Sequence, residues 1–232
     1  MTMLSTRLFA VSLLSLALAA AQNNGSCPQL PDTGVSIGEP VPVHPEHIPA
    51  GCSDFEILVA RGTSEPNYEE GDGKFGIVVG DPVVSNTTVK LPDARGYPVQ
   101  YPASADVVGG TIRGSADVVR RLVSQAADCP NQQFSLVGYS QGAGVMHAAA
   151  KDIPIRLYSR IKSIVMFGDP YHRLGDIFSR FPVGLNNKVM QICADGDPVC
   201  DPQGECTYYH LTYIRPDYVN QAVDFIVQGF AT

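Results

Sequence analysis

The sequence has few basic residues, no pair of cysteines in C-x-x-C spacing and no long apolar run after its first 21 residues. Its 232 residues include 16 lysines and arginines against 23 aspartates and glutamates, a formal net charge of −7. The basic residues form no cluster and are not interleaved with aromatic ones, as they are in many nucleic-acid-binding proteins. The composition therefore argues against a nucleic-acid partner.

The one apolar run of note lies at the beginning of the chain. Arg7 precedes the run Leu8–Leu18, and three alanines follow it. A basic start, about a dozen apolar residues and small residues after them are typical of a secretory signal peptide, and the run is too short to span a bilayer. We expect residues 1–21 to be this signal, cleaved after Ala19 or Ala21. Residues 22–232 would then form a single secreted domain with no membrane span.

The six cysteines lack the spacing of a metal site, and no histidine pair lies near them. In an exported chain an even number of cysteines predicts disulfides, here three. Two N-x-S/T sequons, at Asn24 and Asn86, fit glycosylation of an exported protein. We therefore expect disulfides rather than a bound metal.

Short apolar runs alternate with segments of helical periodicity. Strands are expected at residues 55–60, 97–101, 134–138, 161–167 and 189–193, and helices at 104–127, 141–151 and 218–230. Residues 74–89 look partly helical, with the helix broken or restarted at Pro82. Residues 171–188 look like a loop, and Pro98 places the second strand near a sheet edge. This alternation predicts an α/β fold with a parallel sheet, whose ligands bind beyond the carboxyl ends of the strands.

A G-x-S-x-G motif runs from Gly138 to Gly142, between a predicted strand and a predicted helix. In this context the motif predicts a nucleophile elbow, with the hydroxyl of Ser140 at the apex of a sharp turn. Gly138, Gly142 and Gly144 would let strand and helix approach closely. The N–H of Gln141 would point to the place where an oxyanion forms.

A serine nucleophile needs a base and a carboxylate to orient that base. On α/β sheets these follow the serine in the order aspartate, histidine. That order favours His210 as the base, while His172 stays a candidate. The carboxylates that follow the last predicted strand are Asp195, Asp197 and Asp201, and spacing alone does not choose among them.

Three stretches together resemble the cutinase family, which includes fungal cutinases, cutinase-like polyester hydrolases and acetylxylan esterases. They are the motif at residues 138–142, the sequence C-A-D-G-D-P-V-C at residues 193–200, and His210 followed by leucine. The sequence A-R-G-T at residues 60–63 resembles the oxyanion loop of that family, and the matches extend over about residues 50–230. The resemblance implies a three-layer α/β hydrolase with a five-stranded parallel sheet and no large lid.

The resemblance also implies a role for each matching residue. Ser140 would be the nucleophile, His210 the base, and Asp197 rather than its neighbours the orienting acid. The backbone N–H groups of Thr63 and Gln141 would form the oxyanion hole. No cofactor is implied.

The same resemblance implies the disulfides Cys52–Cys129 and Cys193–Cys200. These leave Cys27 to pair with Cys206, which lies four residues before His210. That pair would tether the histidine loop to the N-terminal arm.

The substrate expectation depends on the loops that flank the site. A typical cutinase carries an apolar rim between the catalytic aspartate and histidine, whereas residues 201–209 are polar here. The opposite loop, residues 181–185, is expected to supply an apolar wall instead. We expect a monomeric serine esterase that acts on cutin-like polyesters and on short-to-medium acyl esters. The alternatives are an acetylxylan esterase, acting on an acylated polysaccharide, and a non-catalytic secreted binding protein on the same scaffold.

Overall fold

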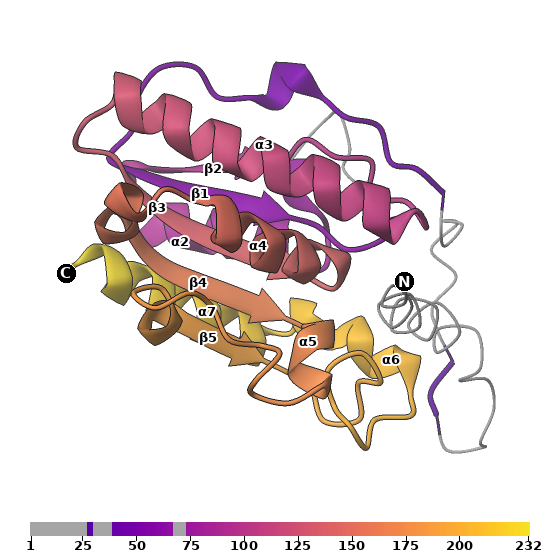
Figure 1. Cartoon of the computed structure of the whole chain (residues 1–232). Helices are drawn as coiled ribbons and strands as arrows, with labels where there is room; N and C mark the ends of the chain where they lie inside the picture. Colours follow the sequence, from indigo (N-terminus) through magenta and orange to yellow (C-terminus); the bar gives the residue numbers. More distant parts are fainter. Residues whose placement is uncertain (1–26, 30–38, 67–72) are drawn as a thin grey trace, which may run out of the picture.

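A five-stranded, all-parallel sheet forms the centre of the computed structural model, which describes residues 27–29, 39–66 and 73–232 (Figure 1). Its order is β2-β1-β3-β4-β5. The strands are β1 (Phe55–Ala60), β2 (Ala94–Pro98), β3 (Gln133–Tyr139), β4 (Ile161–Phe167) and β5 (Val189–Ile192). The parallel sheet and the edge position of the proline-containing strand are thus confirmed. The predicted signal peptide and Asn24 lie outside the described residues.

Helices cover both faces of the sheet, so the predicted three-layer arrangement is confirmed (Figure 1). α3 (Val107–Asp128) and α4 (Gln141–Asp152) pack on one face, and α2 (Gly80–Lys90) and α7 (Pro216–Phe230) on the other. Successive residues of a strand point to opposite faces, so the central strands contribute to two separate apolar cores. None of the helices in the described segments is both long and apolar enough to cross a membrane.

Short helical turns connect these elements. They are η1 (Pro45–His47), η2 (Gly73–Phe75), η3 (Ile155–Arg160), α5 (Pro170–Arg173), η4 (Asn186–Lys188), α6 (Thr207–His210) and η5 (Thr212–Ile214). The region expected to be a loop at residues 171–188 therefore contains most of α5 and all of η4.

Two local predictions are wrong, each for a clear physical reason. β2 begins at Ala94, three residues before the predicted start, and carries a charged residue, Arg95, at its second position. That charge is tolerated because Arg95 Nε donates to Oε1 of Glu56, a buried residue of β1, at 2.8 Å. α2 runs without a break through Pro82, because this proline is the third residue of the helix and its missing N–H needs no intrahelical partner there.

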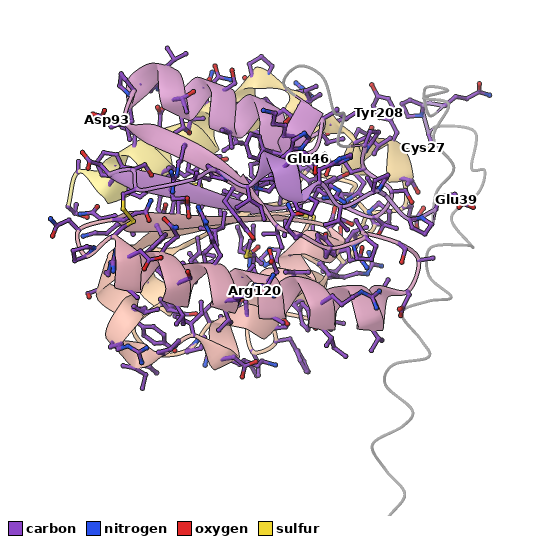
Figure 2. The ribbon with its side chains drawn as sticks, turned by 90° about the horizontal axis from the view of Figure 1, so that it is seen from above. Cys27, Glu39, Glu46, Asp93, Arg120 and Tyr208 are labelled. Atoms are coloured by element: carbon purple, nitrogen blue, oxygen red, sulfur yellow. A yellow bond between two sulfur atoms is a disulfide. The ribbon has the colours of Figure 1, made fainter. Side chains whose placement is uncertain are left out.

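Three disulfides pair all six cysteines: Cys27–Cys206, Cys52–Cys129 and Cys193–Cys200. These are the pairs named from the sequence. Cys27 and Tyr208 lie at one end of the molecule, and Asp93, just before β2, lies at the other (Figure 2). The first disulfide therefore joins the N-terminal arm to the end of the molecule that carries α6.

Candidate active site

Ser140 occupies the turn between β3 and α4 in a strained conformation. Its φ is +55° and its ψ −117°, a region that residues with side chains rarely adopt. The Ser140 N–H donates to the carbonyl of Phe167, at the end of β4, at 3.0 Å. The turn is thus fixed by the neighbouring strand, and the serine lies at the carboxyl edge of the sheet.

The glycines of the motif explain how the turn fits. A Cβ on Gly142 would lie 1.9 Å from the carbonyl oxygen of Ala60, and one on Gly138 would lie 2.7 Å from the carbonyl oxygen of Gly142. Both positions therefore exclude a side chain. The predicted role of Gly144 is wrong, because the nearest atom that a Cβ there would meet is the side-chain oxygen of Thr111, at 3.8 Å.

His210 and Asp197 form a buried pair. Nδ1 of His210 lies 2.8 Å from Oδ2 of Asp197, whose side chain is fully buried. The other carboxylate oxygen of Asp197 accepts the N–H of Val199 at 2.8 Å. His210 lies at the end of α6, and Asp197 lies in the loop closed by the Cys193–Cys200 disulfide. The carboxylate is held in one position and fixes one edge of the imidazole.

The imidazole lies close to the serine turn. The ring of Tyr139, the residue before Ser140, is 5.0 Å from the His210 ring, and its hydroxyl donates to the His210 carbonyl at 2.7 Å. A Cβ on Gly168 would lie 2.7 Å from Cε1 of His210, and Gly168 directly follows the strand residue that binds the Ser140 N–H. In the described part of the chain no hydrogen bond joins the Ser140 hydroxyl to His210. Such bonds often tighten only when substrate is bound.

Thr63 and Gln141 lie beside each other at the same edge. Their side chains are joined by a hydrogen bond of 3.4 Å from Thr63 Oγ1 to Gln141 Oε1, and Gln141 Nε2 donates to the Ser104 carbonyl at 3.1 Å. Within the described segments no hydrogen bond uses the backbone N–H of Thr63 or of Gln141. Both N–H groups are therefore available to an anion.

Backbone strain gathers around this edge. The residues other than glycine with positive φ in the described segments are Ser64, Ala103 and Ser140. The first two are joined by a hydrogen bond of 2.7 Å from the Ser64 N–H to the Ala103 carbonyl. Strained conformations of this kind persist only where surrounding contacts hold them, and they cluster at functional sites.

Glu65 supports the loop that contains Thr63, and sequence reasoning missed it. Its buried carboxylate accepts the N–H of Gly62 at 2.7 Å and the N–H of Val78 at 2.7 Å. Burial raises the pKa of Glu65 to about 7, against the lowering effect of these donors and of the nearby Arg61. The only signal in the sequence is its place two residues after Thr63.

The family model for cutinase matches residues 51–230. The chain belongs to the cutinase family. It is 32% identical over 167 residues to cutinase cut1 of Trichoderma harzianum, an alignment that covers 70% of this chain and 62% of that protein. The match therefore spans less than two thirds of that relative's length.

Solved structures of the family have the same fold. A cutinase of Trichoderma reesei, solved in complex with a phosphonate inhibitor, is 29% identical, with a TM-score of 0.64, and the match covers 86% of this chain and 82% of that one. The catalytic core domain of an acetyl xylan esterase from Trichoderma reesei is 22% identical, with a TM-score of 0.63, and the match covers 77% of this chain and all of that one. At that identity the second likeness shows the fold alone.

The other candidates named from the sequence lie elsewhere in this cutinase fold. Asp195 is exposed, and Asp201 accepts the N–H groups of Gly196 and Gln203, which makes it a cap of its own loop. His172 lies on α5 and forms no ion pair with a carboxylate of the described residues. Of the three aspartates, only Asp197 is hydrogen-bonded to His210.

The loop predicted to form an apolar wall is divided between core and surface. Phe181 and Leu185 are buried in the core under α4, so they cannot line a groove, whereas Val183 is almost completely exposed. Further exposed apolar side chains lie on the same connection, and others lie at the start of α3. They are Leu174, Ile177 and Phe178 on the connection, and Val107, Val108 and Ile112 on α3.

Tyr213 is a further residue that sequence reasoning missed. It is fully buried in η5, and its hydroxyl donates to Oδ2 of Asp197 at 2.5 Å. Nothing in the sequence marks it apart from its position three residues after His210. It extends the pair of Asp197 and His210 into a cluster of three side chains.

One group of residues brings potential metal ligands together. Donor atoms of His44, Glu46 and His47, on the N-terminal arm, lie within 4.8 Å of one another. The carboxylate of Glu46 is mostly exposed and is already engaged by Nδ1 of His44 at 2.7 Å. These residues are not part of the site around Ser140.

Proposed function

We propose that the protein is a serine esterase that cleaves carboxylic esters through an acyl-enzyme. The hydroxyl of Ser140 attacks the ester carbonyl while His210 takes its proton, and the alcohol leaves with that proton. Asp197 fixes the imidazole tautomer and stabilises the imidazolium. Water activated by His210 then attacks the acyl-enzyme and releases the acid, which frees Ser140.

The buried hydrogen bond between His210 and Asp197, beside a strained serine turn, is the observation that carries this proposal. A histidine that was merely a surface residue would not be hydrogen-bonded to a fully buried carboxylate. A serine with positive φ at the carboxyl end of a central strand is also the arrangement in which a hydroxyl stands clear of the sheet. Membership of the cutinase family supports the same chemistry.

The oxyanion of the tetrahedral intermediate would be held by the backbone N–H groups of Thr63 and Gln141. Their hydrogen-bond capacity is unused in the described segments, and their side chains hold each other in place. Donors fixed before the reaction stabilise the developing charge without having to reorganise. No cofactor takes part in these steps.

We propose cutin-like polyesters and short-to-medium acyl esters as substrates. The relative of Trichoderma harzianum is named a cutinase, and exposed apolar side chains on α3 and after α5 suit an acyl-rich polymer. The runner-up is acetylated xylan, which the polar stretch before His210 and its partly exposed Tyr209 favour, since tyrosine rings stack on sugars.

Three disulfides are typical of an oxidising compartment, so we propose that the protein is secreted, as a monomer. Glycosylation at Asn86, an exposed residue of α2, stays a prediction.

Hydrolysis of a series of p-nitrophenyl esters by the purified protein and by Ser140→Ala tests the proposal. We expect the variant to lose at least ~10⁴-fold in kcat/KM, because the nucleophile is gone. Ser85→Ala, an exposed serine on α2, is the matched control and should keep full activity. Activity that survives in Ser140→Ala would refute the mechanism. A wild-type protein that cleaves no ester would instead indicate a binding protein.

The same series distinguishes the substrates. Best activity on butyrate esters together with release of cutin monomers supports the polyester. Strict preference for acetate together with deacetylation of xylan supports the runner-up.

A further inference from the structure

We propose that Tyr213 sets the basicity of His210 by sharing the carboxylate oxygen that His210 binds. Oδ2 of Asp197 accepts Nδ1–H of His210 at 2.8 Å and the hydroxyl of Tyr213 at 2.5 Å. Tyr213 does not touch the reacting atoms, so it is a positioning residue that acts through Asp197. This inference rests on the proposed role of His210 as the base.

The direction of the tyrosine proton follows from a second contact. The backbone N–H of Ala194 donates to the hydroxyl oxygen of Tyr213 at 3.1 Å. The oxygen thus acts as acceptor toward Ala194. Its own proton goes to Oδ2 of Asp197 at 2.5 Å, because the other neighbour, the disulfide sulfur of Cys200 at 3.3 Å, is a more distant and much weaker acceptor. The donors therefore run from Ala194 through Tyr213 to Oδ2 of Asp197, the same oxygen that His210 binds.

The ring of Tyr213 is packed on several sides, so its hydroxyl cannot rotate away from Asp197. Aromatic rings surround it at centroid distances of 5.4 to 6.1 Å, from Tyr218 on α7, Phe167 on β4, Tyr139 on β3 and His210 itself. The side chain is fully buried, and both that burial and the charge of Asp197 raise its pKa, so it stays a protonated donor at every working pH.

A second donor on the same carboxylate oxygen weakens the interaction between that oxygen and His210. A hydrogen bond to a carboxylate stabilises its charged form and draws electron density away from the other contact. The imidazolium of His210 is then stabilised less than by a carboxylate that served it alone. Tyr213 thus makes His210 a weaker base than it would be if the carboxylate of Asp197 served it alone.

The other ionisable groups around the cluster are few. Tyr139 on β3 and Tyr218 on α7 face Tyr213, and the pKa of Tyr139 is raised by burial and by the nearby carboxylates of Glu65 and Asp197. On the aspartate loop, Asp201 caps the turn, and Arg173 donates to two of the loop carbonyls. Replacing Tyr213 leaves all of these in place.

The test measures the pKa of His210 by NMR, with labelled histidine, in the Ser140→Ala background with and without Tyr213→Phe. Phenylalanine keeps the ring and removes the donor. We expect the His210 pKa to rise by about 0.5 to 1 unit. In the enzyme with Ser140 intact, the acidic limb of kcat/KM should move upward by the same amount. Tyr218→Phe, which makes the same change in the same aromatic cluster without touching Asp197, should leave both unchanged.

Loss of the hydroxyl also leaves the Ala194 N–H without its acceptor, so Tyr213→Phe is expected to be less stable whatever its effect on His210. A single 3-fluorotyrosine at position 213 separates the two effects, because it preserves the fold and makes a stronger donor. The His210 pKa should then fall. A pKa that stays constant in both proteins, or moves in the opposite direction, overturns the inference. Because this readout needs no turnover, it holds separately from the esterase test with Ser140→Ala.

Discussion

Glu65 is a carboxyl group for which burial outweighs its hydrogen bonds. Two backbone N–H groups donate to it and Arg61 lies nearby, yet its pKa is raised to about 7 from an ordinary 4.5. The folded protein therefore prefers the protonated form. Its contribution to the free energy of unfolding is most favourable below pH 4.5 and is lost as the pH rises through 7, by about 3 kcal/mol in all.

The variant Glu65→Gln removes the titration, but its amide nitrogen cannot accept the N–H of Gly62 or of Val78 as a carboxyl oxygen does. The informative quantity is therefore the change with pH: we expect the unfolding free energy of Glu65→Gln to rise relative to that of the wild type, by up to about 3 kcal/mol, between pH 4 and pH 8. Urea unfolding at a series of pH values measures the difference. A difference that does not change between pH 4 and 8 contradicts the raised pKa.

Single residues show clearly where the sequence stops being informative. Ser140 and His210 could be singled out from the sequence, because a nucleophile motif and chain order point to them, and their proposed chemistry stays a prediction. Asp197 needed the family resemblance, since Asp195 and Asp201 have the same local setting. Tyr213 and Glu65 could not be predicted from residue patterns, because their importance depends on tertiary contacts and on burial, which no local pattern encodes.

Among the connecting segments, the one from Cys193 to His210, which contains Asp197, is held by two disulfides. Cys193–Cys200 closes the turn that holds Asp197, and Cys27–Cys206 ties the stretch before His210 to the N-terminal arm. The second disulfide joins residues 179 positions apart. By the chain-entropy argument, a cross-link over such a loop contributes up to about 5 kcal/mol by restricting the unfolded chain.

We therefore expect Cys27→Ser with Cys206→Ser to lower the melting temperature by at least ~5 °C and to speed thermal inactivation of the esterase. Calorimetry and residual activity after heating measure the two effects. Cys52→Ser with Cys129→Ser is the matched control, because it removes a long-range disulfide at the other end of the sheet. If the first pair of substitutions left the melting temperature unchanged, the tether would have no stabilising role.

His147 connects α4 to the segment that follows β4. Its Nε2 lies 2.8 Å from Oδ2 of Asp169, and its ring lies between Tyr171 and Phe181 at centroid distances of 4.7 and 4.4 Å. Asp169 also accepts the side-chain amide of Gln191 on β5. One buried cluster thus fixes the beginning and the end of the connection between β4 and β5.

His147→Ala should lower the free energy of unfolding by roughly 2–4 kcal/mol, through the lost ring contacts and the lost partner of a buried carboxylate. His172→Ala removes a histidine from the same connection without breaking an ion pair to a described carboxylate, and we expect a change below about 1 kcal/mol. Chemical denaturation gives both values. Equal effects of the two substitutions would argue against the cluster.

The elements themselves were predicted unevenly. Strands that are mostly apolar, such as 55–60 and 161–167, could be predicted to the residue. β2 was misplaced because Arg95 interrupts its apolar pattern and its buried ion partner is distant in sequence. α2 was predicted to break or to restart at Pro82, because the pattern did not reveal that the helix starts two residues earlier, at Gly80.

For the molecule as a whole, the distribution of exposed apolar side chains differs between the two ends of the sheet. Ile177 and Phe178 follow α5, beyond the carboxyl end of β4, and are 78% and 60% exposed. Ile155, on η3 just before the amino end of β4, is 79% exposed. Ile177 and Ile155 have nearly equal exposure at opposite ends of the sheet, and they provide a matched pair for testing which end meets an insoluble substrate.

We expect Ile177→Ser with Phe178→Ser to reduce adsorption to a polyester film several-fold while hydrolysis of a soluble acetate ester stays the same. Ile155→Ser should change neither. Depletion of the protein from solution over the film measures adsorption. A fall in soluble-ester activity would show instead that these residues support the catalytic site, and unchanged adsorption would contradict the polymer-facing role.

The whole fold was the most predictable level. Alternation of strands with helices requires crossover connections, and these place parallel strands with helices on both faces. These connections leave few possible sheet orders, and they place the serine turn at the carboxyl edge of the sheet. The split of residues 181–185 between core and surface did not follow, because a short apolar loop gives no periodicity that tells its two sides apart.

The two outer strands of the sheet would matter if the protein gathers on a solid polyester, as proposed above. β5 has four residues, and β2 has five, with a glycine at its centre and a proline at its end. Edge strands this short offer few unpaired backbone groups to which a neighbouring copy could add a strand. Copies concentrated on a polymer film should therefore remain separate instead of growing into fibrils.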